Sequence, residues 1–465
     1  MSMMKGFSNV FRIPELRKKI LITLGLVFVC RLISQIPTPG VDWQALQNLI
    51  ADFKANSQGG GMLDWFEVFT GGALGQCAIG FLSIWPYISA QIVTQLLGSV
   101  IPALEKLKKE GESGRQQLAQ ITRYLTIILC VVQSWGIATA LSHPGALGPA
   151  FAGVEIVANP GFGFQLMTVI GMTTASLFVM WLADQITTFG IGNGASLIIM
   201  INITSRLPQA IISAWERYFG LAGVQASAPI AELPIVIIFF LLVVMGTVLL
   251  TQGVRKVAIH TTRRSVGGGN TYGMQQTFMP LRVNYTGVMP IIFAQPLIQI
   301  PAALLMKVTD ATSSGISGTL NRFAQDLSNP TVTHLIAYAV LIMFFAFFWV
   351  ATQFNAIDIS ENLKKDGSYI PGIRPGRATA EYLDDVMTKL TLIGGTGLLI
   401  VALIPMCLMG WMSIPWAIAS FFGGTSLLII VGVALDTLRI MESHLLVRKY
   451  DGCLSHGSLR GRSGR

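Results

Sequence analysis

Long apolar stretches alternate with shorter polar segments along almost the whole chain. Ten of the stretches are long enough to cross a bilayer as helices, which takes about 20 residues each. They cover residues 20–36, 78–100, 121–141, 164–183, 191–214, 233–250, 288–306, 333–353, 389–409 and 414–436. This pattern predicts an all-α polytopic membrane protein with ten transmembrane helices.

The composition agrees with the hydrophobic pattern. Of the 465 residues, 52% are hydrophobic and only 12% are charged, whereas soluble domains carry about 25% charged residues. A soluble globular protein is therefore excluded. The net charge of +9 alone could indicate nucleic acid, but in a membrane protein the position of the positive charges comes first.

The positive charges fix an orientation. If the N-terminus is cytoplasmic, 26 of the 32 Lys and Arg residues fall in cytoplasmic segments or at the cytoplasmic ends of spans. Cytoplasmic loops of membrane proteins carry this excess. The pattern predicts that both termini lie in the cytoplasm, together with loops 251–287 and 354–388.

The spans divide evenly between the two halves of the chain. Each half holds five, so the second half starts on the opposite side of the membrane from the first, which permits an inverted-topology repeat. We expect an N-terminal half over 1–230 and a C-terminal half over 231–465, with a tail from 437 to 465.

Loop 251–287 carries a basic stretch without a compensating acid. After its cations, the next acidic residue is Asp310. Two interpretations remain open: the charges act as a topology signal, or they bind an anionic partner. Both this loop and 354–388 are longer than ordinary connectors. The cations of the basic stretch are Arg255, Lys256, Arg263 and Arg264.

Catalytic and coupling signatures are missing from the sequence. Asp184, Asp310 and Asp436 lie at span ends, whereas coupled transporters keep carboxylates at membrane depth. No P-loop, HExxH or GxSxG motif occurs, and no two of the five cysteines have CxxC spacing. We therefore expect no enzyme activity, no cofactor and no metal. Arg31, the one clear charge inside a span, either extends to an interface or pairs with a carbonyl group.

Helix breakers interrupt several spans. Pro86 stands inside the second span, and Pro290, Pro296 and Pro301 lie in the seventh, which predicts kinked helices around a cavity. A short amphipathic helix at about 62–75 breaks at Gly71–Gly72. It either lies in the membrane interface or folds back into a cavity.

Five motifs together resemble the SecY family, the channel subunits of the bacterial protein translocase. The likeness runs in order from the first span past the tenth. The motifs are "KKEGESGRQQLAQITRY" (108–124), "GIGNGASLII" (190–199), "PLRVNYTGVMPIIFA" (280–294), "ENLKKDGSYIPGIRPGRATAEYLDDV" (361–386) and "FGGTSLLI" (422–429).

The resemblance implies two inverted five-helix halves around an hourglass channel with an apolar constriction. Such a ring resists wetting and ion leak. Ala195 is smaller than the residue usual there, so either the ring is wider or a neighbour fills the gap. The implied pore-ring residues are Ile84, Ile88, Ala195, Ile199, Ile292 and Ile429.

The resemblance also implies a plug, a lateral gate and docking loops. Helix 62–75 would be the plug, with Phe69, Gly71, Gly72 and Leu74. The gate would be lined by Ser89, Gln133 and Ile300. Arg374, between Pro371 and Pro375, would join the loop cations in docking, or else cap a nearby helix end. The docking set is Arg255, Lys256, Arg263, Arg264 and Arg374.

The implied function is a passive polypeptide channel in the cell inner membrane. It would translocate unfolded secretory chains, release transmembrane segments laterally and bind signal sequences, driven by the SecA ATPase or the ribosome. SecE and SecG would complete a heterotrimer, with YidC, SecDF and membrane lipids as further candidate contacts. A solute transporter and a membrane enzyme are the competing classes, and the first lacks intramembrane acids while the second lacks a catalytic constellation.

Overall fold

The computed structural model is helical almost throughout. It describes residues 14–42, 44, 45, 47, 70–73, 75–143, 156, 157, 159–220, 229, 232–261, 276–309, 316–328, 331–412 and 425–456. The chain divides into two compact units. Unit 1 contains 1–58, 63–207 and 433–465, and unit 2 contains 59–62 and 208–432.

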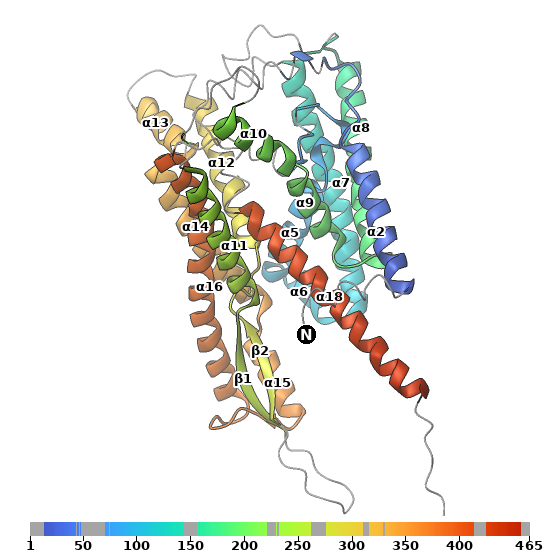
Figure 1. Ribbon diagram of the computed structural model, residues 1–465, viewed down its shortest axis with the longest axis vertical. Helices are drawn as coiled ribbons and strands as arrows, with labels where there is room; N and C mark the ends of the chain where they lie inside the picture. Colours follow the sequence, from blue (N-terminus) through green and yellow to red (C-terminus); the bar gives the residue numbers. More distant parts are fainter. Residues whose placement is uncertain are drawn as a thin grey trace, which may run out of the picture. The chain divides into compact units, whose positions relative to one another are not determined.

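Unit 1 is a helical bundle built around α7 and α8, which pack side by side (Figure 1). α5 packs on α7, and both α2 and α9 pack on α8. The helix α18 starts in unit 2 and belongs to unit 1 from Val433 onward. The elements are α2 (Pro14–Ile33), η1 (Ile79–Leu82), α5 (Trp85–Val100), α6 (Pro102–Lys109), α7 (Glu112–Ser142), α8 (Phe162–Phe189), α9 (Gly194–Thr204) and α18 (Thr425–His456).

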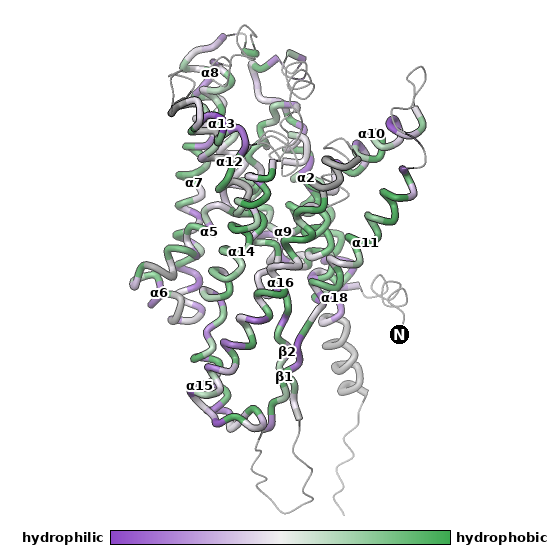
Figure 2. The backbone as a smooth tube through the Cα atoms, turned by 90° about the vertical axis from the view of Figure 1, so that its left-hand side faces the viewer, coloured by the Kyte–Doolittle hydropathy of each residue, from purple (hydrophilic) through white to green (hydrophobic). Residues whose placement is uncertain are grey.

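Unit 2 combines a helical bundle with a small sheet. α14 packs against α12 and α16, and α15 packs against α16. Figure 2 shows α11 mostly in the hydrophobic colour, whereas α15 carries hydrophilic segments. The elements are α10 (Leu207–Phe219), α11 (Glu232–Gln252), β1 (Val254–Thr261), β2 (Gln276–Arg282), α12 (Met289–Thr309), α13 (Ile316–Ser328), α14 (Val332–Gln353), α15 (Ala356–Lys365), β3 (Ser368–Tyr369) and α16 (Arg377–Met412).

The prediction of a helical membrane protein is confirmed. Six helical stretches of the described chain, two of which join consecutive helices, are long and apolar enough to cross a bilayer. They run over Glu112–Ser142, Phe162–Phe189, Gly194–Phe219, Glu232–Gln252, Val332–Lys365 and Arg377–Ile404. The count of ten spans stays a prediction, and so does the division at residue 230; contacts within the chain instead separate the units at Leu207 and at Gly432.

The predicted kink at Pro86 is wrong in its position. Pro86 lies in the first turn of α5, where its missing N–H removes no helical hydrogen bond. The chain turns just before it, at Ser83, whose φ of 46° is positive and therefore uncommon for a residue other than glycine. The stretch 78–100 is therefore a short 3₁₀ turn followed by a separate helix.

The predicted span 191–214 is also divided. α9 ends at Thr204 and α10 starts at Leu207. Pro208 has no N–H to continue an incoming helix, and it disfavours helical geometry in the residue before it. An apolar pattern alone does not detect this break, because hydrophobic residues continue on both sides of it.

The two long loops form one structure. β1 and β2 make an antiparallel hairpin from Val254↔Arg282 to His260↔Gln276, and β3 from the second loop pairs with the other edge of β1. The sheet order is β2-β1-β3. A buried apolar cluster beneath it includes Val257 and Leu281 from the hairpin and Leu383 and Met387 from α16.

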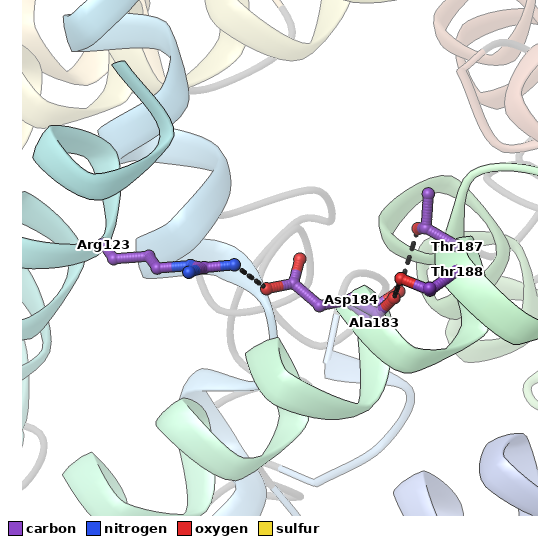
Figure 3. A network of polar contacts seen from close by, with 5 residues as sticks. All are labelled: Arg123, Ala183, Asp184, Thr187 and Thr188. Carbon is purple, nitrogen blue, oxygen red and sulfur yellow. Dashed lines mark hydrogen bonds and ion pairs between the residues drawn. The ribbon is translucent and has the colours of Figure 1, made fainter. Parts of the chain in front are cut away.

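Two contacts join neighbouring helices of unit 1: an ion pair between α7 and α8, and a close backbone approach of α9 to α8. Arg123 Nη2 of α7 lies 2.8 Å from Asp184 Oδ2 of α8 (Figure 3). Both side chains are partly exposed, so the pair contributes at most about 1 kcal/mol. The tighter constraint is Gly194, whose N–H donates to Thr187 Oγ1 at 2.9 Å. A Cβ there would lie 2.0 Å from the Ala183 carbonyl oxygen, so only glycine fits.

Candidate functional site

An apolar cluster in unit 1 brings together the pore-ring candidates of the first half. Ile84 and Ile88, at the start of α5, are 3% and 6% exposed. They are buried with Leu197 and Ile198 of α9, and the partly buried Ala195 and Ile199 pack against the same group. Two pairs of residues that lie more than 100 positions apart in the chain thus meet.

A small hollow opens beside this cluster. Its lining is almost entirely apolar and includes Thr70 from the segment predicted as the plug. The strained turn at Ser83 places Ile84 directly before α5, so that Ile84 and Ile88, one helical turn apart, both face the hollow. The lining residues are Thr70, Phe81, Leu82, Ser83, Ile84, Trp85, Ile88 and Ile199.

The other two pore-ring candidates belong to unit 2. Ile292, near the start of α12, is 4% exposed, and Ile429, near the start of α18, is 2% exposed. Ile292 follows Pro290 in the sequence, and Ile429 follows Gly423 and Gly424, as in the motifs. A ring formed by all six residues stays a prediction.

The segment predicted as the plug is described only around its glycines. Gly71 and Gly72 both have positive φ, 66° and 89°, a conformation that glycine adopts without steric cost. The break predicted there is present as a turn. Phe69 and Leu74 lie outside the described residues.

Arg31 pairs with a carbonyl group, as one of the two interpretations of this residue predicts. Its Nη2 donates to the Gly71 carbonyl oxygen at 3.3 Å, and its Nη1 donates to Asn202 Oδ1 at 3.3 Å. Asn202 in turn donates from Nδ2 to Ser83 Oγ at 3.1 Å. The guanidinium therefore joins α2, α9 and the glycine turn.

Sequence reasoning missed the polar partners of Arg31. Asn202 is only 3% exposed, and it is the sole amide in the apolar run "LIIMINIT" of α9. A buried amide needs hydrogen-bond partners, so an asparagine in such a run together with a lone intramembrane arginine was a usable signal. The sequence does not show, however, that Arg31 and Asn202 would lie beside the turn at Gly71.

The lateral-gate candidates are only partly described. Ser89 lies on α5 and Gln133 on α7, two helices that pack together, and both residues are half-buried. Gln133 Oε1 is buried without a hydrogen-bond partner in the described structure. Ile300 lies in α12, and its side chain is outside the described residues.

The docking candidates of unit 2 share the sheet module. Arg255 and Lys256 are exposed on β1, and Arg374 is exposed in the turn that follows β3. The Arg374 carbonyl accepts a hydrogen bond from Thr379 Oγ1 at 2.9 Å, which ties this turn to the first turn of α16. Arg263 and Arg264 lie outside the described residues. No cluster of metal-ligating side chains occurs among those that the structure describes.

The family model named SecY matches residues 78–438, which is most of the chain and covers the Ile84–Ile88 group, the sheet module and Ile429. This chain belongs to the SecY family. A curated relative, the protein translocase subunit SecY of Streptomyces scabiei, is 41% identical over 454 residues, covering 97% of this chain and all of the relative. The expected membership is thereby confirmed.

Solved structures confirm the fold. One is a SecY protein, which matches with a TM-score of 0.56 at 18% identity. In that protein the plug domain stabilises the closed state of the translocation channel and maintains a membrane seal. Sec61 in the canine ribosome–channel complex from the endoplasmic reticulum matches with a TM-score of 0.55 at 18% identity. Each match covers 92% of both chains. This chain is a multi-pass membrane protein with the SecY fold.

Proposed function

We propose that this SecY-family chain is the protein-conducting channel subunit of a translocase in the cell inner membrane. It passes unfolded secretory polypeptides across the bilayer and releases transmembrane segments sideways. The observation that carries the proposal is the apolar group of Ile84, Ile88, Ala195 and Ile199 beside a narrow hollow. Such a surface offers a passing chain no fixed hydrogen-bond partner, so many sequences can slide past it.

The same apolar group explains how a polypeptide channel can avoid leaking ions. A narrow apolar constriction dewets, which places an energetic barrier before any hydrated ion. Ile292 and Ile429 complete this constriction from the second half of the chain. The segment that includes Thr70, Gly71 and Gly72 acts as the plug, and Thr70 already lines the hollow.

External partners supply the energy, because the chain performs no catalytic step of its own. SecA or a ribosome docks on the cytoplasmic sheet module, whose exposed Arg255, Lys256 and Arg374 contact acidic protein surfaces or RNA phosphates. SecE and SecG complete the membrane complex, and both termini of this chain are cytoplasmic. The relative from the canine complex, which is ribosome-bound, supports this choice of partner.

A reconstitution experiment tests the function. The chain is co-expressed with SecE and SecG and placed in vesicles with SecA and ATP. A precursor carrying a signal sequence is then added, and its protection from external protease is measured. We expect protection that depends on both ATP and the signal sequence. Co-purification of the complex without any protected precursor would overturn the proposal.

A further inference from the structure

The carbonyl oxygen of Gly71 accepts a hydrogen bond from Arg31 of α2 and a longer one from Ser205, which follows α9. We propose that Arg31 is the positioning residue that latches this turn and so sets how readily the channel opens. Asn202 orients the guanidinium of Arg31. The inference rests on the proposed function, since it assigns to named residues the closed state of that same channel.

Glycine is required at position 71 for the latch to form. With φ at 66° the residue is in the left-handed region. A Cβ on Gly71 would lie 2.6 Å from Arg31 Nη1 and 3.0 Å from the Asn202 carbonyl oxygen. The missing side chain thus lets the guanidinium reach the backbone carbonyl oxygen of Gly71.

Neighbouring polar groups fix the orientation of the Arg31 guanidinium. Arg31 stands in the last turn of α2, where a cation is favoured by the helix dipole. Asn202 accepts from Arg31 through Oδ1 and donates to the buried Ser83 through Nδ2, so its amide orientation is determined from both sides. Ser205 Oγ contributes little to the latch, because it donates to the Asn202 carbonyl at 2.7 Å and lies 3.4 Å from that of Gly71.

The chain just after the turn is anchored by shorter bonds. Thr38 donates to the Cys77 carbonyl from its N–H at 2.9 Å and from Oγ1 at 2.6 Å, and the N–H of Ile79 donates to the Ile36 carbonyl at 2.8 Å. Between this anchor and Gly71 lies Gly72, which has φ of 89° and open space around the position of a Cβ. Gly72 can therefore act as the hinge, while Gly71 is the point of release.

The hydrogen bond from Arg31 to the Gly71 carbonyl is therefore the contact that we expect to break when the turn moves. It is longer than the anchoring bonds, and it ends on one carbonyl oxygen. A hydrogen bond from a charged donor is still a substantial interaction where little water reaches it. We therefore expect its loss to shift the closed-to-open ratio by roughly tenfold, which corresponds to about 1.4 kcal/mol.

Paired variants of the full chain in the reconstituted complex test the latch. Gly71→Ala and Gly111→Ala introduce the same methyl group at positive φ, but only the first displaces Arg31, since a Cβ on Gly111 meets no atom within 4 Å. Arg31→Gln removes the charge, and Arg31→Lys keeps it without the planar fork. Resting ion conductance of the vesicles is measured, together with translocation of a precursor whose signal sequence is defective.

The expected order of effects is specific. Gly71→Ala and Arg31→Gln should each raise both resting conductance and translocation of the defective precursor by about tenfold, Arg31→Lys by less, and Gly111→Ala and Ser205→Ala only slightly. Equal conductance in Gly71→Ala and Gly111→Ala, with normal translocation by the wild-type chain, would overturn the latch alone. Absence of translocation by the wild-type complex would instead count against the proposed function.

A folding defect can be told apart from loss of the latch. The thermal unfolding midpoint of each complex in detergent is compared with its conductance. A latch variant should conduct more ions at an unchanged midpoint and translocate a normal precursor as the wild type does. If Arg31→Gln lowered the midpoint and left the resting conductance unchanged, Arg31 would have a structural role only and the inference would be wrong.

Discussion

His260 of β1 lies opposite Tyr369 of β3, and the centroids of the two rings are 5.8 Å apart. This pair joins loop 251–287 to loop 354–388, which the sequence presents as two separate cytoplasmic segments. Val257 and Leu281 from the first loop are buried with Ile370 from the second. Arg255, Lys256 and Arg374, which we propose as docking residues, thus belong to one structural module within unit 2.

The shared sheet predicts that Tyr369→Ala will weaken docking without removing any charge. The ring contact with His260 would be lost, and cross-strand pairs of this kind contribute about 0.2–1 kcal/mol. The hairpin and the turn at Arg374 would then be held together less firmly, although the strand pairing and the buried cluster remain. Affinity for SecA and for ribosomes should fall severalfold, whereas Glu361→Ala on the exposed face of α15 should have no effect. Unchanged affinity in Tyr369→Ala would show that the loops dock independently.

Reversing docking charges should separate function from membrane insertion. Arg374→Glu and the double change of Arg255 and Lys256 to Glu leave other basic residues in the same cytoplasmic segments, so topology should be retained. Partner binding should nevertheless be lost, because a reversed charge at a contact repels. For the Arg255 and Lys256 pair, wild-type binding should weaken as salt rises if phosphates are bound.

A nearby arginine provides the control for charge reversal. Arg377 is exposed at the start of α16 and pairs with Glu381 at 3.1 Å. Arg377→Glu changes the net charge of the module by the same amount as Arg374→Glu. Equal loss of SecA binding in both variants would point to the general field of the module rather than to contact at Arg374. Normal binding in all the reversed variants would leave the loop charges as topology signals only.

Sequence patterns predicted the helical membrane fold because apolar length is a strong signal over 20 residues. They failed where one residue overrides a pattern. The turn at Ser83 and the position of Pro86 lie inside one apolar stretch, and the break before Pro208 lies at a short polar stretch within a predicted span. The pairing of β1 with β3 joins residues more than 100 positions apart, and no local periodicity encodes such a contact.

The candidate site was predicted unevenly for a related reason. Motif likeness located Ile84, Ile88, Ala195 and Ile199, and the structure packs these four together. The partners of Arg31 were not found, because a hydrogen bond to the backbone carbonyl of Gly71 leaves no residue-type signature. Asn202 was recognisable as unusual in an apolar helix, but its partner depends on how α2 and α9 pack.

Polar substitution in the apolar constriction should cause leak. Ile88→Asn places an amide beside the hollow lined by Ile84 and Ile199, where it can hold water and lower the barrier to ions. Burying that amide also destabilises the closed state by about 1–3 kcal/mol. Resting conductance should rise, and defective signal sequences should be accepted more readily. The same is expected of Ile429→Asn.

A conservative change at the same position separates wetting from packing. Ile88→Val removes one methylene and keeps the surface apolar, which costs about 0.5–1.5 kcal/mol of stability. Conductance of Ile88→Val vesicles should remain near the wild-type level. Resting conductance that stayed at the wild-type level in both asparagine variants would remove Ile88 and Ile429 from the constriction.

The approach of α8 to α9 at Gly194 predicts a large effect from one methyl group. A Cβ would lie 2.0 Å from the Ala183 carbonyl oxygen and 2.8 Å from the Ala183 carbonyl carbon. Both atoms are backbone atoms of α8, so the clash can be relieved only by moving the two helices apart. Gly194→Ala should destabilise the protein by about 1–3 kcal/mol, the usual range for overpacking. The thermal unfolding midpoint in detergent measures this loss.

Gly136→Ala is the matched control, because Gly136 lies within α7 and a Cβ there meets no atom within 4 Å. It should raise stability by about 0.5–1 kcal/mol through the lower chain entropy of alanine. Gly194 also starts the helix that carries Ala195 and Ile199, so its alanine variant should leak ions as well as unfold earlier. If Gly194→Ala unfolded no earlier than Gly136→Ala, the α8–α9 contact would be looser than described. The position of the Ala195 and Ile199 side chains would then no longer follow from it.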